Sequence, residues 1–394
     1  MDTKSNRLFF IDAMRAWAIL MMLQGHFIDG LLDTLFRDPE NLFYNTWRYF
    51  RGVTAPVFFT VSGFIFTYLL IRGTAIGWNN TRVKKGIKRG LQLILIGYLL
   101  RLNLFGLLVG EIYEGFFLVD VLHCIGLSLL TIVGVYLLSN KKGKYFFPSV
   151  LLGITLVLFL FEPFYKQWSF SFLPDALANY FTKSNGSVFT IIPWLGYASL
   201  GGFISILFTR FKNIKSFYLK AIGLSLSIGL LLIFTSSDLF LALFEQTGIT
   251  LFKLIEENNY LFIRLGDVFV VFAVFMVFRS LTTHKTVLKI GANTLSIYVI
   301  HFVILYGSFT GLGLYRFFHH QLSPLAVILG ALTFIFICTY LALKYAKYED
   351  VIKDQLGLAI VSFRKEFFVV QKIAITTVKD FFVKLRVFLT RIRN

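Results

Sequence analysis

The chain has few charged residues, few prolines and almost no cysteine. Charged side chains make up 15% of its 394 residues, fewer than a soluble domain of this length would carry. Seven prolines and the lack of a low-complexity stretch argue against a linker to a second soluble domain. Cys124 and Cys338 lie within apolar segments, which favours small core side chains over a disulfide or a metal pair. Asp12 and Arg15 interrupt the first apolar run, so no cleavable signal peptide is expected.

Apolar residues are abundant instead. They make up 57% of the chain, and the mean hydropathy is +0.73. About ten apolar segments are long enough to cross a bilayer. They lie near residues 8–30, 52–71, 91–109, 118–138, 147–162, 188–209, 217–236, 261–280, 291–309 and 324–344. We therefore predict an all-α, polytopic membrane protein with about ten transmembrane helices.

The connections between these segments differ in charge. Basic residues gather at the N-terminus and in alternate connections: Lys4, Arg7, and residues 72–89, 141–144, 210–220 and 279–289. Most acids lie in the other connections, as in the stretch 29–40. Because Lys and Arg are retained on the cytoplasmic side, both termini are predicted to be cytoplasmic. The net charge of +18 then reflects topology and contact with anionic lipid, so nucleic-acid binding is not expected.

The last fifty or so residues have a different pattern from residues 1–345. In 346–394, Phe381, Leu385, Phe388 and Ile392 form one apolar stripe at helical spacing. Lys384 lies off that stripe. We predict a ten-helix transmembrane domain over 1–345 and a basic amphipathic helix on the cytoplasmic face over 346–394. Docking of a partner is the alternative role for this tail.

Arg15 and His26 are the most informative polar residues. Eleven positions on a helix are close to three turns, so both side chains lie on one face, roughly 16 Å apart along the axis. Ionisable groups in a spanning helix are costly in lipid and mark a functional path. His26 could be a general base or could bond a neighbouring helix. Arg15 could pair with Asp12 or bind an anion that enters from the cytoplasm.

Other polar groups lie inside predicted spans. His123 is three positions after Asp120, near the outer end of its segment and at the level of His26, while His301 is near mid-membrane. No close-spaced His or Cys pair supports a metal site, so none is predicted. Arg101 could snorkel or reach a buried anion. The stretch GYASLGG at 196–202 follows no strand, so it indicates close helix packing through small residues.

Several motifs occur in the order of a known superfamily. They are FIDAMRAWAILMMLQGH at the start, PVFFTVSGFIFTYLL at 56–70, VLHCIGLSLL at 121–130, IIPWLGYASLGG at 191–202 and GANTLSIYVIH at 291–301. Together they resemble the membrane acyltransferase superfamily that includes the acyltransferase 3 family and the heparan-α-glucosaminide N-acetyltransferase-like proteins. The resemblance covers about residues 8–345. Ala16 stands where a glycine is common, and the first outer loop is short.

The resemblance implies transfer of an acyl group, usually acetyl from cytoplasmic acetyl-CoA, to a sugar hydroxyl or amine across the membrane. By position, His26 is the expected catalytic histidine, Arg15 its motif partner and His123 the alternative. We expect Arg15, Arg101 and the basic connection to bind the phosphates of the donor; the connection supplies Arg82, Lys84, Lys85, Lys88 and Arg89. Asp12, Trp194 and His301 are expected to contact the acceptor. A bacterial inner membrane is the expected location.

His26 could remove a proton from the acceptor or could itself become acylated. Two other classes of function remain open on the residues alone: a transporter of a small anion or sugar-linked precursor, and a structural scaffold or sensor. The lack of an internal repeat argues against transport. The sequence does not indicate the oligomeric state.

Overall fold

The computed structural model describes residues 8–73 and 75–393, and these residues form helices and no strand. The long helices are α1 (Phe9–Leu31), α2 (Leu42–Leu70), α3 (Thr81–Leu100), α5 (Val121–Leu138), α6 (Phe146–Leu160), α9 (Ile191–Phe211), α10 (Phe217–Thr247), α12 (Tyr260–Val277), α14 (Thr294–Tyr306) and α16 (Pro324–Arg393). Shorter ones are α4 (Leu104–Leu108), α7 (Glu162–Tyr165), α8 (Asp175–Ala178), α11 (Thr250–Glu257), α13 (Lys285–Ala292) and α15 (Leu314–Phe318). The fold class is therefore all-α, as predicted.

Six helical segments among the described residues are long and apolar enough to cross a membrane. They are 42–70, 115–138, 191–211, 217–247, 260–277 and 324–355, and the bent pair α13–α14 is a seventh if counted as one span. A polytopic membrane protein is thus supported, whereas the count of ten spans and the cytoplasmic termini stay predictions. Lys4 and Arg7, which contributed to the topology prediction, lie outside the described residues.

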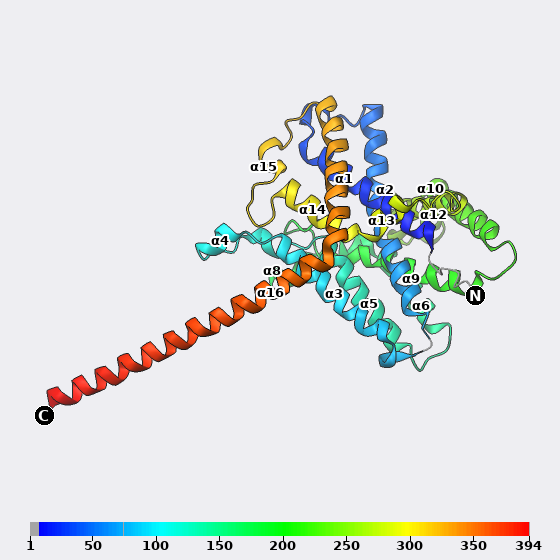
Figure 1. The fold of residues 1–394 in the computed structure, drawn as a ribbon. Coiled ribbons are helices and arrows are strands. Elements are labelled where there is room, and N and C mark those ends of the chain that lie inside the picture. The colour runs from blue at the N-terminus through cyan, green and yellow to red at the C-terminus, as the bar shows by residue number, and fades with distance from the viewer. Residues whose placement is uncertain (1–7, 74, 394) are drawn as a thin grey trace. The chain divides into compact units, whose positions relative to one another are not determined.

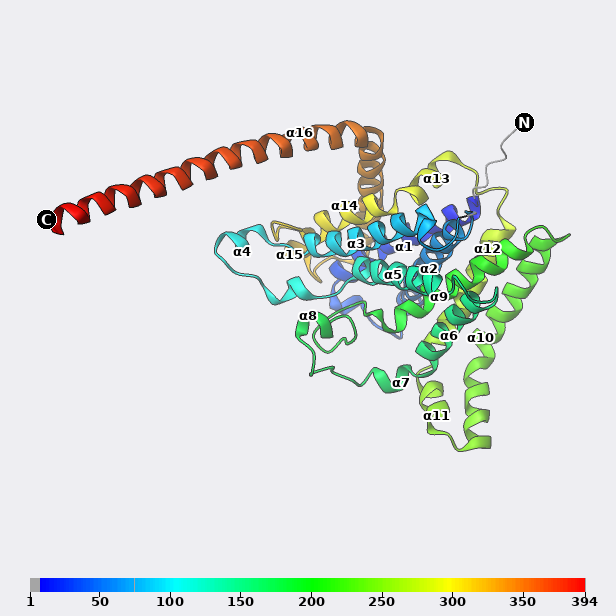
Figure 2. The same cartoon turned by 90° about the horizontal axis from the view of Figure 1, so that it is seen from below.

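Small residues bring the helices of residues 8–341 into close contact. α2 packs on α9, α3 on α5, and α10 on α12, as Figures 1 and 2 show. A Cβ atom on Gly201 would lie 1.8 Å from the Thr60 carbonyl oxygen, and one on Gly63 would lie 1.9 Å from that of Ala198. Only glycine permits these backbones to approach so closely. The packing role predicted for the 196–202 stretch is confirmed.

The bend between α13 and α14 places the residues of α14. The two helices meet at Asn293 with an angle of 69° between them. Before the bend, Gly291 lies against the Asp12 carbonyl oxygen, where a Cβ would come within 2.0 Å. After it, α14 runs beside α1 and ends at Tyr306; Gly307 follows as the C-cap, with a φ of 72° that favours glycine. The sequence predicted a span near 291–309; the structure divides this segment at Asn293, and α14 begins at Thr294.

The bounds of the predicted span near 91–109 differ from those of the helix in the structure. The helix begins at Thr81 and ends at Leu100, and Arg101 follows as its C-cap. The Asn103 side chain accepts hydrogen bonds from Phe105 N at 3.0 Å and Gly106 N at 3.3 Å, which starts the short helix α4. A capping asparagine in an apolar run therefore ended the span early. Two backbone bonds tie this turn to the end of α14: Phe309 N to Leu102 O and Leu104 N to Phe309 O, each 2.9 Å.

The chain divides into two compact units, Met1–Leu341 and Ala342–Asn394. In the second unit the backbone remains helical to Arg393, which agrees with the predicted helix. The side chains of Phe381, Leu385, Phe388 and Ile392 lie outside the described part of the structure. The amphipathic character of the tail and the boundary at residue 345 therefore stay predictions.

Candidate active site

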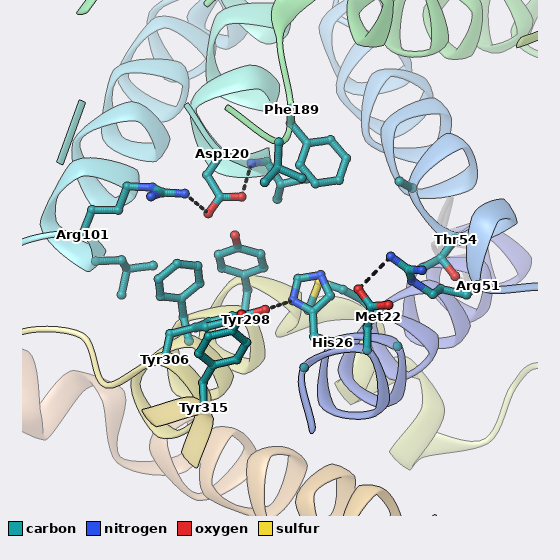
Figure 3. A pocket seen from close by; sticks show the side chains of 18 of the residues that line it. Met22, His26, Arg51, Thr54, Arg101, Asp120, Phe189, Tyr298, Tyr306 and Tyr315 are labelled. Carbon is teal, nitrogen blue, oxygen red and sulfur yellow. Dashed lines mark hydrogen bonds and ion pairs between the residues drawn. The ribbon is translucent and has the colours of Figure 1, made fainter. Parts of the chain in front are cut away.

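One large cavity lies in the first unit and contains the His26 side chain. Its volume is about 990 Å³. Its walls come from the C-terminal half of α1, the N-terminal half of α2, the turn after α3, the start of α5 and the C-terminal half of α14. Figure 3 shows His26 and Tyr298 between the Arg101–Asp120 pair on one side and Arg51 on the other. The pocket is large enough for a sugar-sized ligand.

The His26 ring is half-buried and is held from one side by α14. Its Nδ1 lies 3.3 Å from His301 Nε2 and 3.2 Å from the Tyr306 hydroxyl. His301 is fully buried, and its own Nδ1 lies 2.5 Å from the Tyr298 carbonyl oxygen. His301 does not line the cavity, so its contact is with His26 and not with the cavity space. The carbonyl, His301 and His26 thus form one chain of hydrogen bonds.

Arg15 also contacts α14, at Thr294, which lies seven residues before His301. Its guanidinium donates to Thr294 Oγ1 at 3.1 Å and lies 3.6 Å from the Asp12 carboxylate. Arg15 and His26 therefore share the face of α1 that meets α14, as their spacing predicted. Neither Arg15 nor Asp12 lines the cavity. The structure thus supports the pairing of Arg15 with Asp12 and gives neither residue a contact with the cavity.

Asp120 connects Arg101 to the start of α5. Its carboxylate accepts from Val121 N at 2.7 Å and pairs with the Arg101 guanidinium at 3.3 Å. Asp120 N in turn donates to His123 Nδ1 at 3.1 Å, so Asp120 and His123 cap the helix reciprocally. His123 is fully buried and does not line the cavity. Arg101 and Asp120 reach the cavity, while His123 has a capping role.

Two further carboxylates orient arginines on the opposite wall. Asp29, one turn after His26 on α1, pairs with Arg51 of α2 at 2.9 Å. Asp267 pairs with Arg264 on α12 at 2.9 Å and accepts from the Tyr49 hydroxyl at 2.7 Å. The Arg264 guanidinium also stacks over the Tyr49 ring, 4.3 Å from its centroid. These contacts fix where the two cations sit.

Three tryptophans, Trp47, Trp168 and Trp194, differ in their position relative to the cavity. Trp194 lines the cavity and packs against Phe59 and Phe189, with ring centroids 5.1 Å and 4.9 Å away. Trp47 does not line it, and its indole N–H donates to Gln24 Oε1 at 2.7 Å. Trp168 is exposed after α7. Only Trp194 is placed to contact a ligand in this cavity.

The basic connection lies away from the cavity. Arg82, Lys84, Lys85, Lys88 and Arg89 are exposed on the first half of α3, and none lines the cavity. Arg101 is at the other end of the helix, about 18 Å from Arg89 by the helical rise. Of the residues predicted to bind donor phosphates, only Arg101 therefore reaches the cavity with His26.

Several cavity residues were not predicted from the sequence. They are Arg37, Arg48, Arg51, Lys183, Arg264, Tyr298 and Tyr306. Arg264 lies within an apolar segment, as Arg101 does, and could have been noted on that ground. Arg48 and Arg51 lie outside the predicted segment 52–71, whereas α2 begins at Leu42 and contains both residues.

Comparison with known proteins gives a match to one family. The model of the acyltransferase 3 family, described as an acyltransferase domain, matches residues 8–343. This range includes every residue of the cavity. No curated protein matches the chain.

Proposed function

The chain belongs to the acyltransferase 3 family and is a membrane acyltransferase; from this we propose that it moves an acetyl group from cytoplasmic acetyl-CoA to an outer sugar. The acceptor group is a hydroxyl or an amine of a sugar or glycan. The observation that carries the proposal is His26, which enters a cavity of about 990 Å³ while its Nδ1 is held by α14. We place the protein in a bacterial inner membrane.

The hydrogen-bond chain indicates which nitrogen of His26 acts. The Tyr298 carbonyl can only accept, so His301 Nδ1 carries the proton and donates to it. A neutral imidazole has one N–H, which leaves His301 Nε2 as an acceptor. We therefore assign the His26 proton to Nδ1, which donates to His301 Nε2 with the Tyr306 hydroxyl oxygen as a second acceptor, so that His26 Nε2 keeps a free lone pair. His301 is thus a positioning residue: its contact selects the His26 tautomer in which Nε2 carries no proton and can act as a base.

In the reaction, His26 Nε2 takes the proton of the acceptor O–H or N–H as that atom attacks the thioester carbonyl carbon. The C–S bond breaks, the acyl group stays on the acceptor, and the sulfur leaves as free CoA after protonation. The imidazolium is stabilised by the His301 contact. If His26 were acylated first, the same Nε2 would be the nucleophile.

Two substitutions test the base, with labelled acetyl-CoA and membranes that contain the natural acceptor. His26→Ala should insert normally and lower the rate about a hundredfold or more, because a general base is lost. His319→Ala is the control, since His319 is exposed and does not line the cavity. Turnover of His26→Ala near that of the control would reject His26 as the base.

His301 gives a second arm of the same experiment. His301→Leu cannot accept from His26 and should lower kcat about tenfold or more while the acetyl-CoA KM stays constant. His301→Gln retains an acceptor and a donor and should recover most of the rate. Equal losses in both variants would leave His301 only a packing role.

A further inference from the structure

The cavity around His26 is strongly basic. Its lining includes six Arg or Lys side chains, Arg37, Arg48, Arg51, Arg101, Lys183 and Arg264, and two carboxylates, Asp29 and Asp120. Asp267, behind the wall, pairs with Arg264. Asp29, Asp120 and Asp267 pair with Arg51, Arg101 and Arg264. The other three cations, Arg37, Arg48 and Lys183, have no partner among these carboxylates.

The three remaining cations are free to act on a ligand. Arg37 donates to the backbone carbonyls of Leu32, at 3.0 Å, and Asp29, which orient it without neutralising it. Arg48 and Lys183 form no ion pair with any residue that the structure describes. Unneutralised cations around a shared cavity repel one another, and an anion would relieve that repulsion.

Four residues that line the cavity also carry buried polar atoms without hydrogen-bond partners among the described residues. Thr54 Oγ1, Ser308 Oγ, Trp194 Nε1 and Arg101 Nε are buried, make no hydrogen bond to the described residues, and belong to cavity-lining residues. An unmet buried donor costs about 1–3 kcal/mol. The indole and guanidinium N–H groups can only donate, so the missing partner is a hydrogen-bond acceptor. Figure 3 shows Arg51, Thr54 and Arg101 around the open space beside His26.

We propose that this cavity selects an acceptor glycan that carries an anionic group, a carboxylate or a phosphate, held by Arg37, Arg48 and Lys183 beside His26. This rests on the proposed function. The phosphates of the donor would be the other source of such an anion. They have a separate set of exposed cations at Arg82–Arg89, about 18 Å or more along α3 from Arg101.

Binding to the purified full-length protein in detergent, measured by calorimetry, tests the proposal. The probes are hyaluronan tetrasaccharide, which has carboxylates, chitotetraose, which has none, glucose 1-phosphate, glucose and acetyl-CoA. We expect each anionic probe to bind at least about tenfold more tightly than its neutral counterpart, with the advantage lost at high salt. Equal binding of charged and neutral probes would overturn the proposal.

Matched double variants separate the two sources of the anion. Arg48→Gln with Lys183→Gln should weaken the anionic sugars about tenfold and leave acetyl-CoA binding unchanged. Lys84→Gln with Lys85→Gln removes the same charge at the other end of α3 and should leave sugar binding unchanged. If the first pair weakens acetyl-CoA instead of the sugars, the cavity binds the donor and the proposal is wrong.

A transfer assay on the same preparations distinguishes this proposal from the proposed function. If anionic sugars bind as expected but no labelled acetyl reaches any acceptor, the proposed function fails and the anion site stands. If acetyl transfer occurs and depends on His26, but neutral and anionic acceptors are used equally, the function stands and the anionic preference fails.

Discussion

Two groups of basic residues lie at opposite ends of α3 and have different surroundings. At the start of the helix, Arg82, Lys84, Lys85, Lys88 and Arg89 are exposed and close in sequence. At its end, Arg101 is mostly buried against Asp120 and shares a cavity with cations from four other parts of the chain. The first group can attract an anion from solution but is largely screened by water and salt. In the second group Arg101 and Arg264 are mostly buried and paired with carboxylates, whereas Arg48 and Lys183 are exposed. What distinguishes this group is that its cations surround one cavity, so together they can discriminate between ligands.

Substitutions at the two ends of α3 should differ most in their effect on the free energy of unfolding. Arg101→Met leaves the Asp120 carboxylate largely buried without its cation and should destabilise the protein by about 3 kcal/mol. Lys88→Met removes an exposed charge and should change stability by about 0.5 kcal/mol or less. The denaturation midpoint in detergent measures both.

A second substitution checks the cause of that loss. Adding Asp120→Asn to Arg101→Met removes the unpaired charge while Asn can still cap α5, so part of the stability should return. If Arg101→Met and Lys88→Met change the stability equally, the Arg101–Asp120 pair contributes nothing to it and the two ends of α3 do not differ in this respect.

Donor binding should depend on the exposed end. Replacing Lys84, Lys85 and Lys88 with Gln should raise the acetyl-CoA KM about fivefold with kcat unchanged, because phosphate contacts at an exposed site are weak and uniform. The pair Arg48→Gln and Lys183→Gln is the control and should leave this KM as it is. An unchanged KM in the triple variant would leave these lysines with a role in topology alone.

The last test determines on which side of the membrane Asp38 and Lys85 lie, and its substitutions should change activity least. Cys124 and Cys338 are free and buried, as their apolar surroundings predicted, and Cys→Ala at both gives a background without thiols. In it, Asp38→Cys should react with an impermeant maleimide from outside intact cells. Lys85→Cys should react only after permeabilisation, and neither change should alter kcat. The reverse pattern would place the donor and the acceptor on the wrong sides.

The sequence could predict contacts and shared faces between residues a few turns apart on one helix. The pairing of Asp12 with Arg15 follows from a three-residue step, and the shared face of Arg15 and His26 follows from eleven residues of helix. The contact of His26 with His301 joins residues 275 positions apart, and no local pattern encodes it. The role of His301 as a partner of His26 therefore became visible only when the helices were packed. The contact of His123 with Asp120, in contrast, spans three residues, but that spacing alone did not distinguish a capping role from a catalytic one.

By itself, the sequence determined that the chain is helical and apolar, crosses a membrane, and resembles acyltransferases over nearly its whole length. Those properties depend on hydropathy and on short motifs, which are local. Only the tertiary structure decided which cations meet around the His26 cavity and which lie away from it. The end of α3 at Leu100, just before the Asn103 cap of α4, and the bend at Asn293 set those distances, because each redirects the chain and so determines which distant side chains share a cavity.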